Sequence, residues 1–103
     1  MNRIDQLKEF LKVTPNDTFL KHALALEYIK KGDEQAAKML FENILNNEPS
    51  YVGSYYHLGK LLERINDNQA AIAVYQTGMK EAKLAKDKHS YNELQAALED
   101  LDE

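Results

Sequence analysis

The chain has 103 residues, of which 44% are hydrophobic and 29% charged, and its formal net charge is −4. This length fits one small domain, and no apolar run approaches the roughly 20 residues that cross a bilayer. Because the sequence has no cysteine, disulfides and thiol chemistry are excluded. The acidic balance argues against general nucleic-acid binding. We therefore expect a cytoplasmic protein with neither a nucleic acid nor a membrane as partner.

Apolar residues recur at steps of three and four along nearly the whole chain, a spacing that keeps one face of an α-helix dry. In the first segment they are Ile4, Leu7, Phe10 and Leu11. No alternating strand pattern of useful length is present. The sequence therefore predicts six helices, at roughly 2–13, 17–31, 34–46, 51–65, 68–84 and 88–101.

The residues between these segments favour helix ends and helix starts. Gly32, and Asn66 at the matching place 34 residues later, can adopt positive φ at a helix C-terminus. Asp33 can then cap the helix that follows. The start of the last helix has two candidate signals, which are Asp87 as its cap or a capping box of Ser90 with Glu93.

The segments GDEQAAKMLF at 32–41 and NDNQAAIAVY at 66–75 are nearly the same and lie 34 residues apart. A fixed period of this size indicates a stacked repeat. Around these segments the chain resembles the tetratricopeptide repeat family, a helix–turn–helix unit of 34 residues with a sparse set of preferred residues. The matching residues are Leu24, Ala25, Tyr28, Ala37, Phe41 and Pro49 in the first copy, and Leu58, Gly59, Leu62, Ala71, Tyr75 and Gly78 in the second. Lys21, Ile44 and Lys83 depart from the pattern.

The resemblance implies an all-α fold, a right-handed α-α superhelix of stacked antiparallel helix hairpins. We expect a single domain over residues 1–103. Its expected parts are an N-terminal half-repeat helix at 1–15, a first repeat at 18–51, a second repeat at 52–85 and a C-terminal capping helix at 86–103.

Residues with catalytic or metal-binding chemistry are scattered along the sequence. His22, His57 and His89 lie far apart, and we interpret His89 with Glu93 as a solvated pair. We therefore expect no enzymatic activity, no cofactor and no metal site. A local basic cluster, interpreted as a solvated helix end, is formed by Lys80, Lys83, Lys86 and Lys88.

The most informative residues are those that the helical wheel places opposite the core. In relatives of this kind the corresponding side of the first helix of each hairpin lines a concave groove that holds peptide partners. The candidate groove residues are Phe19, His22, Leu26 and Lys30 in the first repeat, and Tyr56, Lys60 and Arg64 in the second. The groove would have an apolar end and a basic end.

Two functions from different classes remain open at this point. The leading one is a non-enzymatic protein–protein interaction module that binds a peptide or helix of a partner in its groove. The alternative is a structural self-association unit, a homodimer or higher homo-oligomer formed by repeat stacking, because two repeats are fewer than the roughly three that give comfortable stability.

Overall fold

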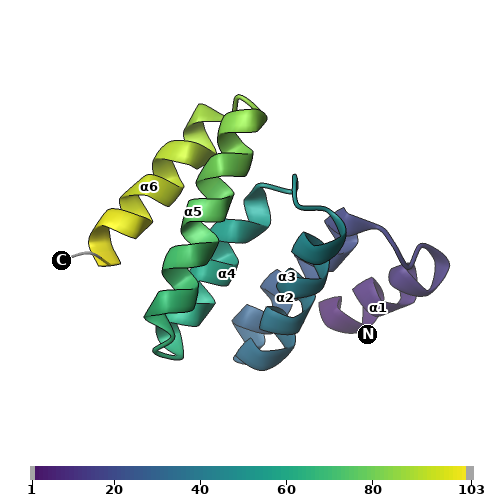
Figure 1. Ribbon diagram of the computed structural model, residues 1–103. Coiled ribbons are helices and arrows are strands. Elements are labelled where there is room, and N and C mark those ends of the chain that lie inside the picture. Colours follow the sequence, from purple (N-terminus) through teal and green to yellow (C-terminus); the bar gives the residue numbers. More distant parts are fainter. Residues whose placement is uncertain (1, 102–103) are drawn as a thin grey trace. The chain divides into compact units, whose positions relative to one another are not determined.

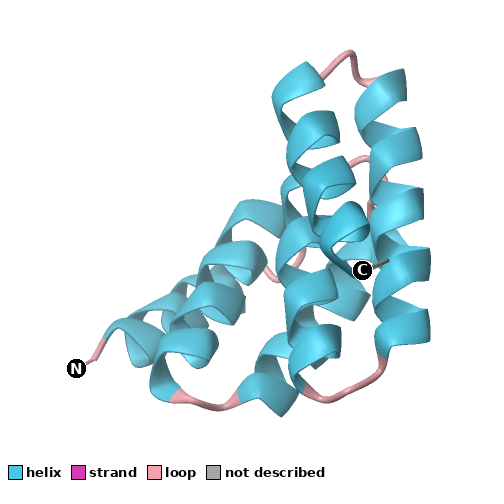
Figure 2. Ribbon diagram, turned by 90° about the vertical axis from the view of Figure 1, so that its left-hand side faces the viewer, coloured by secondary structure: helices cyan, strands magenta, loops and turns pink. Residues whose placement is uncertain are grey.

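The computed structural model describes residues 2–101, and these residues contain six helices and no strand (Figures 1 and 2). The chain divides into two compact units, one ending at Glu48 and the other beginning at Pro49. The all-α prediction is confirmed. None of the helices within residues 2–101 is long and apolar enough to cross a membrane.

The first unit holds α1 (Arg3–Val13), α2 (Thr18–Lys31) and α3 (Glu34–Asn47). Both α1 and α3 pack against α2. The centre of this packing is a cluster of buried apolar side chains formed by Ile4, Leu7 and Leu24, with Leu11, Leu20, Ala23, Tyr28 and Leu40 against it. The expected stripe on the first helix is only partly buried, because Phe10 keeps 54% of its surface exposed. Phe10 lies about 100° around the helix from its neighbour Leu11, at the edge of the stripe.

The second unit holds α4 (Gly53–Arg64), α5 (Asn68–Leu84) and α6 (Lys88–Leu101). Here α5 packs against both α4 and α6, and α6 also contacts α4. Two glycines permit this packing. A Cβ built on Gly59 would lie 2.1 Å from the ring of Tyr75, and one built on Gly78 would lie 2.7 Å from the Cβ of Tyr55. The fully buried Tyr75 therefore fills space that a side chain at residue 59 would occupy.

The same turn design occurs three times. Gly32, Asn66 and Lys86 all have positive φ, at 90°, 64° and 59°. The amide of the next residue donates to a carbonyl five residues back: Asp33 to Tyr28, Asp67 to Leu62 and Asp87 to Ala82, each at 2.9 Å. This is the C-terminal closure that a left-handed residue provides. The first two turns confirm the prediction from Gly32 and Asn66, and the third was not anticipated.

In each of these turns an aspartate also starts the next helix. The carboxylates of Asp33, Asp67 and Asp87 accept a hydrogen bond from the backbone amide three residues later, at 3.1, 3.2 and 3.0 Å. The question left open for the last helix is settled in favour of Asp87, which also accepts from the hydroxyl of Ser90 at 2.8 Å. Asp17, in the turn between α1 and α2, caps α2 in the same manner, because its carboxylate accepts a hydrogen bond from the amide of Leu20 at 3.0 Å.

Candidate functional site

The candidate residues of the first unit lie on α2 and differ in how much surface they offer. Phe19, near the start of α2, is 69% exposed. His22 is half-buried, and its ring packs edge-on against the buried ring of Phe41, with the centroids 5.5 Å apart. Leu26 is half-buried and Lys30 is exposed. Phe19 is therefore the main apolar contact that this face presents, whereas His22 also contributes to packing.

Lys30 is not an isolated cation. Its Nζ lies 3.2 Å from Oε2 of Glu27 on the same helix. An exposed pair of this kind contributes little to stability, because water screens both charges. Lys30 can therefore exchange this contact for a carboxylate on a partner at small cost.

The candidate residues of the second unit lie on α4, at successive steps of four residues. The Nζ of Lys60 lies 5.5 Å from the centroid of the Tyr56 ring, within the range of a cation–π contact. Arg64 is exposed at the end of the helix. The structure thus brings Tyr56 and Lys60 into contact, as their spacing suggested.

Glu63 lies beside these residues and is not among the candidates selected from the sequence. Its Oε2 lies 3.5 Å from Nζ of Lys60, and it accepts a hydrogen bond from the hydroxyl of Tyr75. Burial, reinforced by this bond, raises the pKa of Tyr75. The basic end of the face therefore contains a carboxylate that offsets part of its charge. The i,i+3 spacing of Lys60 and Glu63 was the signal in the sequence.

The remaining histidines lie in different surroundings. His57 is half-buried beside the ring of Tyr56, and burial lowers the pKa of His57. His89 is exposed in the first turn of α6. In the part of the chain that the structure describes, no group of three or more His, Asp or Glu side chains is arranged to hold a metal ion. Over the same residues every buried side-chain nitrogen or oxygen has a hydrogen-bond partner.

Comparison with known proteins connects this architecture to relatives. The sequence matches the family described as Tetratricopeptide repeat twice in succession, over residues 20–51 and 52–83. The crystal structure of a tetratricopeptide repeat domain protein from Salinibacter ruber is 38% identical, with a TM-score of 0.81, and the match covers 84% of this chain and 96% of that one. A solution structure from Bordetella parapertussis, 24% identical, shares the fold with a TM-score of 0.84 over 98% of this chain and 88% of that one.

Two curated relatives are much longer proteins. The chain is 30% identical over 73 residues to the aspartyl/asparaginyl beta-hydroxylases of Mus musculus and Homo sapiens. The match covers 71% of this chain and spans only 10% of the length of each relative. This match covers only the region that resembles tetratricopeptide repeats.

Proposed function

Because the chain belongs to the tetratricopeptide repeat family, whose repeats generally mediate protein–protein interaction, we propose that it binds a peptide or helix of a protein partner on the faces of α2 and α4 defined above. Proteins of this family are generally non-enzymatic modules. We extend the same role to this chain, with its parts at 1–15, 18–51, 52–85 and 86–103 as set out from the sequence. We also propose that the protein is located in the cytoplasm.

The observation that carries the proposal is the exposure of Phe19. A phenylalanine that leaves 69% of its surface in water gives up most of the free energy that its burial would supply. Aromatic side chains are also among those that concentrate binding energy when a partner covers them. The half-buried Leu26, two turns along the same helix, extends the apolar surface.

The α4 face supports a partner of mixed character. Tyr56 offers a ring that is partly covered by Lys60, and Arg64 adds a second cation at the helix end. Glu63 keeps Lys60 in place through a pair that a carboxylate on a partner can join or replace. The α2 face therefore suits an apolar stretch of a partner, and the α4 face suits an acidic one.

The test begins with a peptide selected from a displayed random library against the whole chain, and its affinity is then measured by calorimetry. We expect Phe19→Ala to weaken binding by more than about tenfold, the effect of about 1.4 kcal/mol at a well-covered aromatic anchor. The matched control is Met39→Ala on α3, because Met39 is 62% exposed but lies outside both faces.

Charge reversal at Lys60 and Arg64 should weaken the same complex and flatten its dependence on salt. Lys12→Glu is the control for each single reversal, since it makes the same change in net charge at an exposed residue of α1. If Phe19→Ala and the reversals leave the affinity unchanged while circular dichroism shows an intact fold, the two faces are not the binding site.

Self-association remains the second candidate, and a specific observation favours it. On α1, Phe10 and Val13 are 54% and 82% exposed. They are three residues apart, so they are neighbours on the helix surface, on a side that α2 does not cover. A second copy that buried this surface would gain apolar contact. Light scattering after size-exclusion chromatography distinguishes the two: a monomer at about 0.1 mM removes the second candidate, and a dimer that Val13→Asp dissociates supports it.

A further inference from the structure

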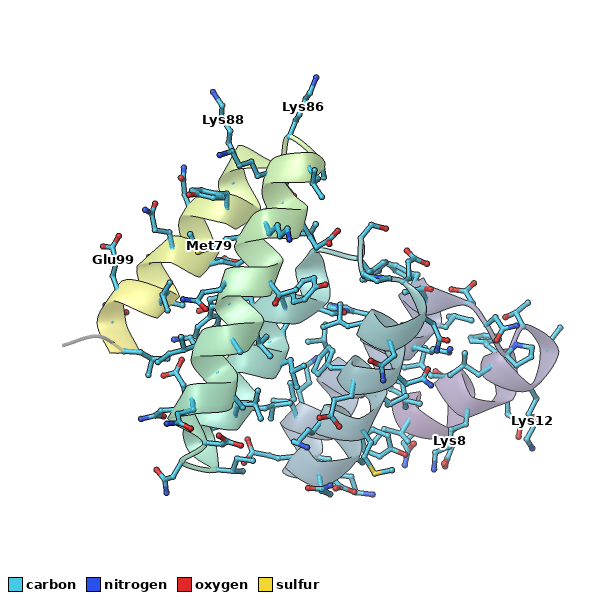
Figure 3. The ribbon with its side chains drawn as sticks, in the orientation of Figure 1. Lys8, Lys12, Met79, Lys86, Lys88 and Glu99 are labelled. Atoms are coloured by element: carbon cyan, nitrogen blue, oxygen red, sulfur yellow. The ribbon has the colours of Figure 1, made fainter. Side chains whose placement is uncertain are left out.

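A basic cluster at the junction of α5 and α6 lies outside the faces proposed above. Lys80 and Lys83 are on the last turns of α5, Lys86 is in the connecting turn and Lys88 opens α6. Figure 3 shows Lys86 and Lys88 extending from this turn, away from the helices. All four side chains are exposed.

The side chains of these four lysines, like that of Lys31, have no hydrogen-bond or ion-pair partner among the described residues, whereas those of the remaining lysines have a partner. Lys12, Lys30, Lys38 and Lys60 each pair with a glutamate, Lys21 donates to Asn43, and Lys8 lies over the ring of Tyr28. Within residues 2–101, no hydrogen bond or ion pair is made by the ammonium groups of Lys80, Lys83, Lys86 and Lys88. Four exposed lysines are thus gathered at one junction of a chain whose net charge is −4, with Glu81 and Asp87 between them in the sequence.

The interpretation of this cluster as a solvated helix end accounts for only part of it. Lys83 lies in the last turn of α5, where a cation is favoured by the helix dipole. Lys88 lies in the first turn of α6, where the same dipole disfavours a cation, although the carboxylate of Asp87 that caps this helix offsets part of the cost. Lys86 has a φ of 59°, a conformation that its counterparts Gly32 and Asn66 adopt more readily. Lys86 and, to a lesser degree, Lys88 therefore stand at positions that local preference disfavours, a pattern that is found at functional sites.

A cavity of about 480 Å³ lies at the same junction. It is lined by Ala82, Lys83, Lys86, Asp87, Lys88 and Tyr91. Ala82 is buried and Tyr91 half-buried, and they supply the apolar part of the lining, whereas Lys83, Lys86 and Lys88 are exposed. The carboxylate of Asp87 is held by the amide and hydroxyl of Ser90, at 3.0 and 2.8 Å, and is engaged in starting α6.

We propose that this cavity binds a short acidic segment of a partner protein, with one apolar side chain against Ala82 and Tyr91 and flanking carboxylates on Lys83, Lys86 and Lys88. The charges are complementary, and the apolar part of the lining suits a peptide side chain better than a bare phosphate. This site lies on α5 and α6 and does not depend on the α2 and α4 faces.

The probe is a fluorescein-labelled peptide, Glu-Glu-Leu-Phe-Glu-Glu, titrated with the whole chain and followed by anisotropy. A second peptide, with glutamine in place of every glutamate, measures how much of the binding affinity comes from the negative charges. We expect the acidic peptide to bind, the glutamine peptide to bind much more weakly, and the double variant Lys86→Asn/Lys88→Gln to weaken binding about five- to tenfold, as two exposed pairs predict.

The matched control is Lys12→Gln/Lys31→Gln, which changes the net charge equally at exposed positions of α1 and α2. It should leave the affinity within about twofold at physiological salt, where charges this far from the site are screened. An equal loss in both double variants would mean that only net charge matters, which overturns the proposal. A loss caused instead by Lys60→Gln/Arg64→Gln would place the acidic peptide on α4 and also overturn it.

Two further outcomes decide against the site. One is the failure of the unaltered chain to bind the acidic peptide. The other is binding to phosphatidylserine vesicles that requires Lys86 and Lys88 while the peptide does not bind, because that would make the junction a lipid contact. Circular dichroism of each variant confirms that the helices are intact.

Discussion

Replacing Gly59 by alanine tests the packing of the second unit most sharply. The new Cβ would lie 2.1 Å from Cε1 and 2.5 Å from Cζ of Tyr75, so the ring must move by more than 1 Å to restore van der Waals contact. Tyr75 is fully buried and its hydroxyl is bound to Glu63. The ring therefore cannot move without disturbing its neighbours and this bond.

The expected magnitude combines three effects. Overpacking a well-packed core costs about 1–3 kcal/mol, and weakening a hydrogen bond to a charged group costs about 1.5–3 kcal/mol. Alanine in place of glycine within a helix returns about 1 kcal/mol. The net loss in unfolding free energy should be about 3 kcal/mol, which lowers the melting temperature of a chain of this size by about 12–24 °C.

The assay is thermal and urea unfolding followed by circular dichroism, with Tyr75→Leu as the second arm of a double-mutant cycle. Once the ring is gone, Gly59→Ala should be neutral or stabilising by up to about 1 kcal/mol. If Gly59→Ala raises the stability of the otherwise unaltered chain, Gly59 does not serve to admit Tyr75 and our account of the α4–α5 contact is wrong.

Three more predictions follow from single features of the second unit. Lys86→Asn should raise the unfolding free energy by about 1 kcal/mol, because asparagine tolerates the positive φ; unchanged urea unfolding would contradict this. Burial lowers the pKa of His57 below 6.5, so the unfolded chain binds the proton more readily and stability should fall as the pH drops from about 7 through 6.5 toward the lowered value. His57→Gln should remove that part of the pH dependence, whereas His89→Gln should leave it in place. Equilibrium urea unfolding at a series of pH values checks both. A chain ending at Ala85 loses the buried Leu94 and should aggregate or self-associate in light scattering, whereas a stable monomer would show α6 to be dispensable.

The helices and their ends could be predicted because their causes are local. Apolar spacing fixes which faces are buried, and the positive φ of Gly32 and Asn66 follows from their own chemistry. Lys86 was missed because nothing in a lysine signals that conformation. The φ of 59° at Lys86 and the hydrogen bond from the amide of Asp87 to the carbonyl of Ala82 identify it as the third such turn.

The candidate site was less predictable because side-chain partners depend on tertiary packing. The helical wheel selected Tyr56 and Lys60, which do meet. It could not show that His22 packs on Phe41, or that Glu63 is shared between Lys60 and Tyr75. Each of these contacts joins residues from two helices or depends on a third side chain, so periodicity along one helix does not contain them.

Partner binding on α2 and α4 is the central claim, and amide chemical-shift mapping tests it most directly. The ¹⁵N-labelled chain is titrated with the library-selected peptide, and every backbone amide is followed. We predict that the largest shifts fall on residues 18–31 and 53–64, the spans of α2 and α4, and include Phe19 and Tyr56. Shifts confined to α1, α3 or the junction of α5 and α6, with α2 and α4 unchanged, would contradict the claim.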